Sequence, residues 1–174
     1  MLFRSFLEDQ LPGPGPVCGP PFKKRQLADA EFGFRIAKET SRLDIGQSVV
    51  VRHGTVLAAE AFEGTNGCIK RGGELGRGKE VMLVKVSKPN QDFRFDVPVI
   101  GPVTIDTACA AKVRVLGVEA GRTLLLERRR LIALADERGL PVAAAHALAD
   151  EEHRVRLPVM FAAELVLLRI AREL

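Results

Sequence analysis

Tryptophan and tyrosine are both absent from this chain of 174 residues, and the nine phenylalanines fall mostly at positions that suit a hydrophobic core. Proteins that bind nucleic acid usually set aromatic side chains among basic ones, because bases stack on aromatic rings. The excess of positive charge is also small: 26 Lys and Arg stand against 22 Asp and Glu, which gives a net charge of +4. We therefore expect no nucleic-acid partner, although the positive excess leans weakly toward anionic ligands.

Cysteine is scarce as well, and the three cysteines form no recognisable pattern. Cys18, Cys68 and Cys109 are far apart, odd in number and without histidines at ligand spacing. Neither a disulfide framework nor a zinc site can be read from them. We expect a reducing compartment.

Long hydrophobic runs are missing from both ends of the chain. The first residues, Met1–Leu7, include Arg4 and are followed by two acidic residues, so they lack a signal-peptide core and we expect no export. The last segment, Val159–Leu174, is apolar but contains charged residues, among them Glu164, Arg169 and Arg172, and is shorter than the ~20 residues that a membrane span requires. We expect it to be a helix that lies on a membrane surface or packs against protein.

Proline and glycine occupy most positions of Leu11–Pro21, which predicts a linker because proline removes backbone donors and blocks helices. The overall composition, 47% hydrophobic and 28% charged, is typical of one hydrophobic core. We therefore expect a leader or linker over residues 1–26, one domain over residues 27–146 and a helical extension over residues 147–174.

Helical and strand-like segments alternate through the predicted domain. Hydrophobic spacing predicts these helices: Leu27–Leu43, Thr65–Arg71, Pro102 to about Ala111, and Arg128–Glu137. In the first of them, Lys38, Glu39 and Arg42 can face water. Strands are predicted at Ile45–Arg52, Thr55–Phe62, Val81–Ser87, Val113–Glu119, Thr123–Leu126 and Leu140–Ala144. The pattern predicts an α/β fold with a mixed, partly antiparallel sheet flanked by helices.

The glycine-rich stretch Arg71–Lys79 partly matches a nucleotide-binding P-loop, because Gly73, Gly78 and Lys79 fit GxxxxGK. The next residue is Glu80, which offers no hydroxyl for magnesium and would repel phosphate. A strand-like segment then follows where a P-loop requires a helix. We interpret the stretch as a connecting loop.

The segment from Val84 to Gly101 carries the densest polar signal. If Phe93–Val97 is extended, its phenylalanines anchor one face while Asp92, Arg94 and Asp96 line the other. Further polar side chains lie close in sequence: Lys85, Lys88 and Gln91. Carboxylates can hold Mg²⁺ while Lys and Arg meet phosphate oxygens. The alternative is an exposed strand whose Asp and Arg pair only with each other.

Carboxylates also stand at the ends of strands that are otherwise suited to burial: Asp44, Glu60, Glu63 and Glu119. A buried carboxylate is costly unless it is paired or bound to metal. Glycines flank these positions, at Gly46, Gly64, Gly101 and Gly121. Together they predict a polar cleft at one edge of the sheet.

Four segments resemble, in order and spacing, the second domain of the LpxI family of UDP-2,3-diacylglucosamine pyrophosphatases. They are DIGQSVVV (Asp44–Val51), VLAAEAFEGTN (Val56–Asn66), VKVSKPNQDFRFDVPVIG (Val84–Gly101) and VLGVEAGRTLLL (Val115–Leu126). The resemblance covers about Ala28–Ala145. It implies Mg²⁺-dependent cleavage of UDP-2,3-diacylglucosamine to UMP and 2,3-diacylglucosamine 1-phosphate (lipid X), in lipid A biosynthesis at the cytoplasmic face of the inner membrane.

Residue roles follow from the same resemblance. Asp96 matches the family's essential aspartate in its RxDLPxIG block, which implies a catalytic, Mg²⁺-coordinating role. Lys85, Lys88 and Arg94 would hold the pyrophosphate. Candidates for other substrate contacts are Gln47, Glu63, Gly64, Thr65, Gln91, Gly101 and Glu119. The family's EGTD is EGTN here, so Asn66 lacks a charge that family members carry.

Family members carry a preceding domain, with the substrate between the two domains, whereas a short proline-rich leader stands there in this chain. We therefore expect an LpxI amino-terminal domain as a partner in cis or in trans. The alternative is a non-catalytic module that binds a UDP-sugar or an acylated sugar phosphate.

Overall fold

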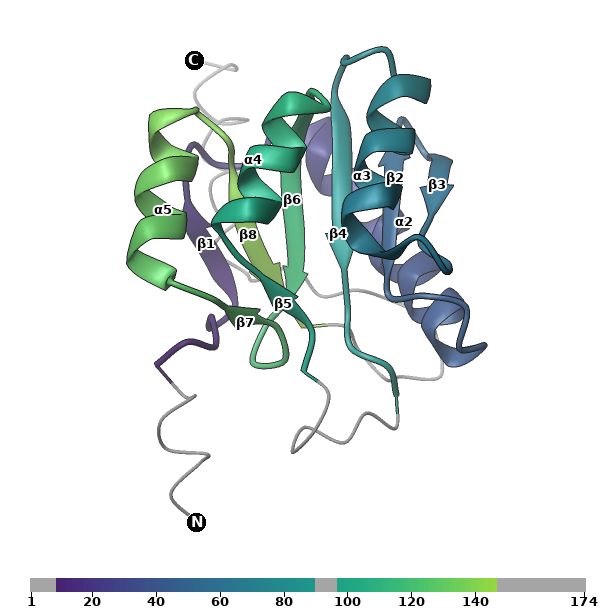
Figure 1. The fold of residues 1–174 in the computed structure, drawn as a ribbon, viewed down its shortest axis with the longest axis horizontal. Helices are drawn as coiled ribbons and strands as arrows, with labels where there is room; N and C mark the ends of the chain where they lie inside the picture. Colours follow the sequence, from purple (N-terminus) through teal and green to yellow (C-terminus); the bar gives the residue numbers. More distant parts are fainter. Residues whose placement is uncertain (1–8, 90–96, 147–174) are drawn as a thin grey trace, which may run out of the picture.

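The computed structural model describes residues 9–89 and 97–146, which form a sheet with helices on both faces (Figure 1). The main sheet has six strands: β1 (Gly15–Cys18), β2 (Ser48–Arg52), β3 (Thr55–Ala59), β4 (Val81–Lys85), β6 (Val113–Glu119) and β8 (Val142–Ala145). The helices are α2 (Lys24–Arg42), α3 (Gly64–Leu75), α4 (Pro102–Ala110) and α5 (Arg128–Glu137). Two short strands, β5 (Val99–Ile100) and β7 (Leu124–Leu125), pair separately.

The strand order is β1-β8-β6-β4-β2-β3. The three central strands, β8, β6 and β4, run parallel, while β1 on one side and β2 and β3 on the other are antiparallel to their neighbours. Parallel neighbours require crossover connections, and α4 and α5 provide them. The prediction of an α/β fold with a mixed, partly antiparallel sheet is confirmed.

Helix α2 covers one face of the sheet, and α3, α4 and α5 cover the other (Figure 1). Side chains along β4 alternate between two cores: Val84 packs in the core that contains Phe34 of α2, and Leu83 packs in the core beneath α3 and α4. Because β4 is buried on both faces, its sequence is almost continuously hydrophobic. A polar residue at its end therefore enters a largely buried environment.

The linker predicted for Leu11–Pro21 is wrong over Gly15–Cys18, which form β1 and pair with β8. Pro16 stands opposite Ala143, at the edge of the sheet. An edge strand tolerates proline because one side of the strand needs no ladder hydrogen bonds.

The loop predicted for Arg71–Lys79 is wrong over its first half, because α3 continues to Leu75. Two glycines in this helix permit close packing rather than a turn. A Cβ at Gly72 would lie 2.5 Å from Val50, and one at Gly73 would lie 2.1 Å from the carbonyl oxygen of Ala111. The rejection of a P-loop is confirmed, since Gly73 lies within α3 and a strand follows directly.

The carboxyl ends of β4 and β6 meet at one edge of the sheet, together with the start of β2, because β2 runs antiparallel to β4. Ser48 of β2 stands directly opposite Lys85 of β4. The extended segment predicted at Phe93–Val97 and the last predicted helix lie outside the described residues, apart from Val97. Over residues 9–89 and 97–146, no helix has the length and hydrophobicity needed to cross a membrane.

Candidate functional site

Most of the predicted polar residues that the structure describes lie where β4 and β6 end. We refer to this end of the sheet, as opposed to its edge strands β1 and β3, as the carboxyl edge. Lys85 ends β4, Glu119 ends β6, and Gln47 precedes β2. Thr65 lies in the first turn of α3, which begins at Gly64 with a positive φ of 73°. Residues far apart in the sequence therefore meet at one end of the sheet, as predicted.

A chain of hydrogen bonds on the α3 face of this edge links Lys85 to Glu60. Lys85 Nζ donates to Thr65 Oγ1 over 2.8 Å, and Thr65 Oγ1 donates to Glu60 Oε1 over 3.0 Å. Ser48 Oγ lies 3.4 Å from the same Thr65 oxygen. The Lys85 and Glu60 side chains are both buried, with 7% and 9% of each residue exposed. Burial of opposite charges is tolerable here because the hydroxyl of Thr65 connects them.

Local sequence explains this arrangement. Strand alternation places Lys85 on the same face as Leu83, and Glu60 on the same face as the buried Ala58. The residue opposite Lys85 is the fully buried Ser48. The Ser48 hydroxyl adds a polar atom beside Thr65 Oγ1, the oxygen to which Lys85 donates.

Glu119 forms a second cluster with residues of α2 and of the segment after β4. Its carboxylate accepts hydrogen bonds from the backbone N–H of Ser87 over 2.7 Å and from Ser87 Oγ over 2.8 Å. Lys38 Nζ lies 2.8 Å away, and Arg122 Nε lies 3.8 Å away. Burial lowers the pKa of Lys38 from its ordinary value, and the hydrogen bond with Glu119 opposes that shift.

Lys38, which helical spacing allowed to face water, is instead largely buried. Lys38 follows the buried Ala37 and lies four residues after the buried Phe34, so its stem starts from the core side of α2. Its ammonium reaches the edge of the sheet, where only 26% of the side chain is exposed. Helical spacing from Phe34 was the signal that could have placed it correctly.

Glu63 and Lys88, two other predicted residues, are held in ion pairs. Arg71 binds the Glu63 carboxylate, and the resulting hydrogen bond holds the pKa of that carboxyl below its usual range. Lys88 pairs with the exposed Asp44. The structure thus places Glu60, and not Glu63, in the hydrogen-bonded chain of Lys85. Glu60 is one of the strand-end carboxylates of the sequence but not one of the predicted substrate contacts. Strand alternation from the buried Ala58 is the signal that predicts its burial.

Two buried polar atoms near this edge have no hydrogen-bond partner among the residues that the structure describes: Gln47 Oε1 and Glu60 Oε2. Buried acceptors are rarely left unsatisfied in native proteins. An unsatisfied acceptor is typical of a position where a ligand supplies the donor. This observation agrees with the prediction that Gln47 contacts substrate, without testing it.

Asp96, Gln91 and Arg94 lie outside the described residues, so their predicted roles stay predictions. Gly101 is buried and caps α4, where its N–H donates to Thr104 Oγ1 over 3.2 Å. Among residues 9–89 and 97–146, no group of three or more His, Cys, Asp or Glu side chains could hold a metal ion. The only buried carboxylate oxygen without a partner in these ranges, Glu60 Oε2, belongs to a residue already bonded to the chain of Lys85.

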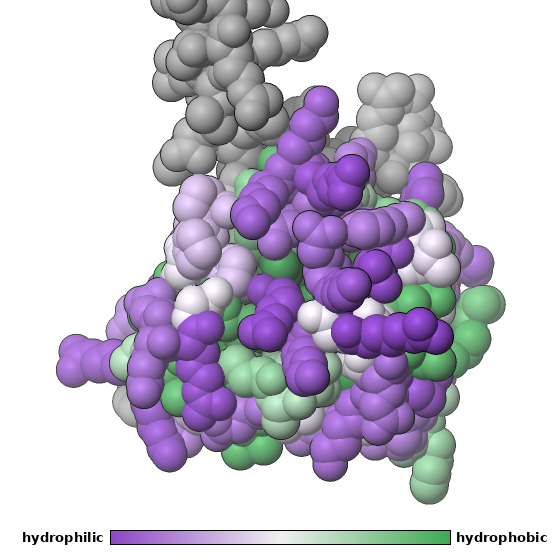
Figure 2. Space-filling view, turned by 90° about the horizontal axis from the view of Figure 1, so that it is seen from above, coloured by the Kyte–Doolittle hydropathy of each residue, from purple (hydrophilic) through white to green (hydrophobic). Residues whose placement is uncertain are grey.

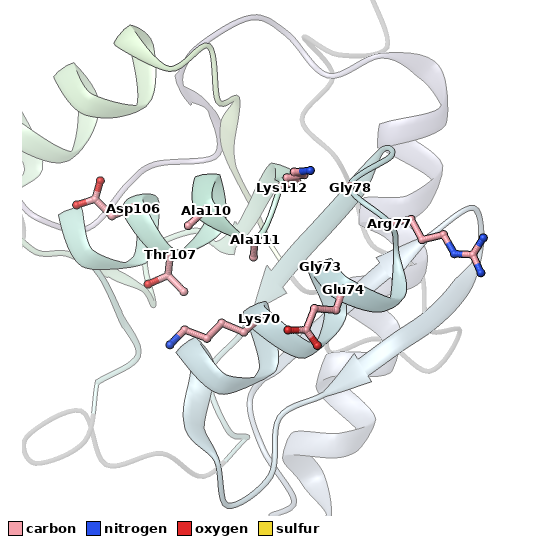
Figure 3. A pocket seen from close by; sticks show the side chains of 10 residues that line it. All are labelled: Lys70, Gly73, Glu74, Arg77, Gly78, Asp106, Thr107, Ala110, Ala111 and Lys112. Carbon is pink, nitrogen blue, oxygen red and sulfur yellow. The ribbon is translucent and has the colours of Figure 1, made fainter.

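A shallow depression of about 630 Å³ lies between α3 and α4, away from this edge (Figure 3). Its lining carries both signs of charge: Lys70, Arg77 and Lys112 are basic, and Glu74 and Asp106 are acidic. Seen from above, the end of the molecule that holds the amino ends of β4 and β6 is covered mainly by hydrophilic side chains (Figure 2). The mixed charge is typical of an ordinary solvated surface, and we assign no site there.

The sequence is similar to those of known proteins. The family model described as the LpxI C-terminal domain matches residues 13–143. A curated relative, UDP-2,3-diacylglucosamine pyrophosphatase LpxI of Caulobacter vibrioides, is 42% identical over 121 residues, which cover 66% of this chain and 43% of the relative. The chain therefore spans less than half the length of that relative. The range matched by the family model, residues 13–143, begins before β1 and includes both polar clusters.

Proposed function

Because this chain belongs to the LpxI C-terminal domain family, we propose that it contributes the pyrophosphate-binding part of a UDP-2,3-diacylglucosamine pyrophosphatase. The reaction would hydrolyse the pyrophosphate to give UMP and 2,3-diacylglucosamine 1-phosphate in lipid A biosynthesis. The relative of this name matches the chain at 42% identity. The proposal extends that relative's activity to this chain.

The buried ammonium of Lys85 is the observation that carries the proposal. A lysine head group at the end of a buried strand is expensive unless it meets negative charge. Here it lies beside Thr65, in the first turn of α3, where the backbone N–H groups of the helix face outward with a partial positive charge. An ammonium and a helix amino terminus together suit phosphate oxygens.

The described residues would act by binding and orienting the substrate. Lys85, with Lys88 nearby, would offset the charge of the pyrophosphate as it grows during attack by water. Glu60 would hold the Lys85 ammonium in place through Thr65. Mg²⁺, which the family resemblance implies through Asp96, would supply further charge neutralisation when bound.

Location and partners follow from the same proposal. The substrate carries two acyl chains, so the protein would act at the cytoplasmic face of the inner membrane as a peripheral protein. An LpxI amino-terminal domain, in cis or in trans, would complete the substrate site, because the chain matches only 43% of the relative.

Release of UMP from UDP-2,3-diacylglucosamine tests the proposal. The chain would be assayed with Mg²⁺ and with the amino-terminal part of the Caulobacter vibrioides relative supplied as a separate polypeptide. We expect UMP release, and we expect Asp96→Ala to reduce it by about 100-fold or more. Equal rates for the wild-type chain and Asp96→Ala would contradict the assignment.

A second candidate function is binding of a UDP-sugar or acylated sugar phosphate without turnover. Asn66 favours it, because the family motif EGTD has an aspartate at that position and an exposed asparagine carries no charge. Binding of the substrate without UMP release, with the amino-terminal domain present, would support this function. Restored hydrolysis would reject it.

A further inference from the structure

The Glu119 carboxylate is buried and faces other protein groups: three hydrogen bonds converge on Oε2, and Oε1 lies beside Lys38 and Arg122. Only 3% of the residue is exposed, and its carboxylate already accepts hydrogen bonds from Ser87 N–H, Ser87 Oγ and Lys38 Nζ. Arg122 adds a longer ion pair at 3.8 Å. A carboxylate with these contacts holds neighbouring protein groups in position and does not bind a ligand.

Ser87 is held at three atoms. Glu119 binds its N–H and its hydroxyl, and Lys38 Nζ donates to its carbonyl oxygen over 2.9 Å. Ser87 lies two residues after Lys85 and immediately before Lys88, where the chain leaves β4. Three elements, α2, β4 and β6, therefore fix the direction in which the chain departs from the sheet. The backbone immediately before Lys88 is therefore held in place.

A similar buried carboxylate lies elsewhere in the molecule and shows what a purely structural role looks like. Asp29 of α2 is 5% exposed and accepts the backbone N–H groups of His53 and Gly54 over 2.9 and 2.8 Å. That pair of bonds closes the turn between β2 and β3, at the other end of these strands from Lys85. Asp29 stabilises the turn between β2 and β3, and Glu119 stabilises the segment that follows β4. Only Glu119 lies close in the structure to a segment with predicted phosphate-binding lysines.

We propose that Glu119 is a positioning residue that acts through Ser87 to fix the backbone from which Lys88 would reach pyrophosphate, and that it does not contact substrate. Lys88 pairs with Asp44 in the structure, so pyrophosphate would take the place of that carboxylate. The proposal rests on the pyrophosphate-binding function proposed above. Lys38 completes the arrangement by neutralising Glu119 while holding the Ser87 carbonyl group. The expected consequence is that loss of Glu119 affects anion binding only when Lys88 is present.

Hydrogen exchange of backbone amides tests the first part. Ser87 N–H, Ser87 Oγ and Lys38 Nζ all donate to Oε2 of Glu119. Glu119→Gln makes this acceptor neutral, or places an NH₂ group there, so we expect the Ser87 amide to exchange at least about tenfold faster. The Val84 amide, in the middle of β4, should exchange at the wild-type rate. Ser87→Ala, which removes only the hydroxyl, is a milder variant in case Glu119→Gln folds poorly. Unchanged protection of the residue 87 amide in folded Glu119→Gln would overturn the proposal.

A double-mutant cycle on pyrophosphate affinity, measured by calorimetry, tests the second part. We expect Glu119→Gln to weaken binding about tenfold in the wild-type background and less than about twofold in the Lys88→Met background. Asp29→Asn, the matched control, should lower stability without changing affinity. Full additivity of Glu119→Gln and Lys88→Met, with binding by the wild type, would overturn this inference alone. Absence of binding by the wild type would contradict the proposed function and this inference with it.

Discussion

The ammonium of Lys85 and the carboxylate of Glu60 are joined through one hydroxyl, that of Thr65, with hydrogen bonds of 2.8 and 3.0 Å. The three residues come from the end of β4, the segment after β3 and the start of α3. A single oxygen thus connects three elements at the edge of the sheet. Changes at Thr65 should therefore affect both stability and ligand binding.

Thr65→Val would remove this hydroxyl while keeping the shape of the side chain. Lys85 and Glu60 would lose their common partner in a buried setting, which we expect to cost about 1–3 kcal/mol in the free energy of unfolding. Thr65→Ser keeps the hydroxyl and is the matched control, with a loss below about 1 kcal/mol. Urea denaturation of the two variants measures the difference. Equal stability of the valine and serine variants would show that the hydroxyl does not connect the two charges.

Cysteine reactivity should follow burial. Burial raises the pKa of Cys68 to about 12 and that of Cys18 to about 11, so neither forms the reactive thiolate near neutral pH. Cys109 is only partly buried. We expect iodoacetamide at pH 8 to modify Cys109 first in the folded protein, as mass spectrometry of digested samples can show. Modification of all three cysteines at similar rates without denaturant would contradict this burial pattern.

Gly73→Ala should destabilise the protein strongly. The added Cβ would lie 2.1 Å from the carbonyl oxygen of Ala111, a backbone atom that cannot move without shifting α4. We expect a loss of about 1–3 kcal/mol, typical of overpacking. Gly13→Ala is the control, because nothing lies within 4 Å of a Cβ there. A thermal melt in which both variants match the wild type would rule out the close contact of α3 with α4.

The ion pair between Glu63 and Arg71 predicts a pH dependence. Because the pKa of Glu63 is lower in the folded protein, its contribution to stability is complete above the unfolded-state value and is lost as pH falls through the lowered folded-state value. Glu63→Gln should therefore reduce stability at pH 7, and the difference from the wild type should shrink as the pH falls below the unfolded-state pKa of the glutamate. Because the pair is exposed, the effect should be small.

Glu31→Gln serves as the control for that measurement. Glu31 is an exposed carboxylate of α2 that forms no ion pair with the residues that the structure describes. Urea denaturation at several pH values should give a smaller change for Glu31→Gln than for Glu63→Gln. An equal pH dependence for the two variants would count against a specific Glu63–Arg71 interaction.

The strong periodic segments of the fold were predictable from the sequence. The predicted bounds of β6 and α5 agree with the structure, and those of α2 and α4 differ by a few residues at most. In each of these segments, local hydrophobic spacing and tertiary packing favour the same structure. The mixed sheet followed from the same alternation.

The wrong predictions concern proline and glycine. At these positions, long-range contacts determine the local structure. Proline and glycine predicted a linker at Gly15–Cys18, but pairing with β8 makes an edge strand there. Gly72 and Gly73 predicted a loop, yet they allow α3 to approach β2 and α4 closely. Both errors arise because the breaker signals of glycine and proline are local, while strand pairing and helix packing are not.

The sequence predicted where the candidate site lies, but not which of its side chains are hydrogen-bonded to each other. Strand-end polar residues predicted one polar edge, and the structure brings Thr65 and Lys85 into contact there. The partners Glu60 and Lys38 depended on which face of an element each residue occupies, and alternation or helical spacing had to be followed residue by residue to find them. The role of Glu119 required its actual hydrogen-bond partners, which no sequence pattern supplies.

The proposal that pyrophosphate binds at the edge of Lys85 and Thr65 is tested most directly by titrating ¹⁵N-labelled protein with pyrophosphate and mapping the amide shifts. We predict the largest changes at Thr65, Lys85 and Ser87, and their loss in Lys85→Met. Shifts centred instead on the depression between α3 and α4, around Lys70 and Lys112, would contradict it.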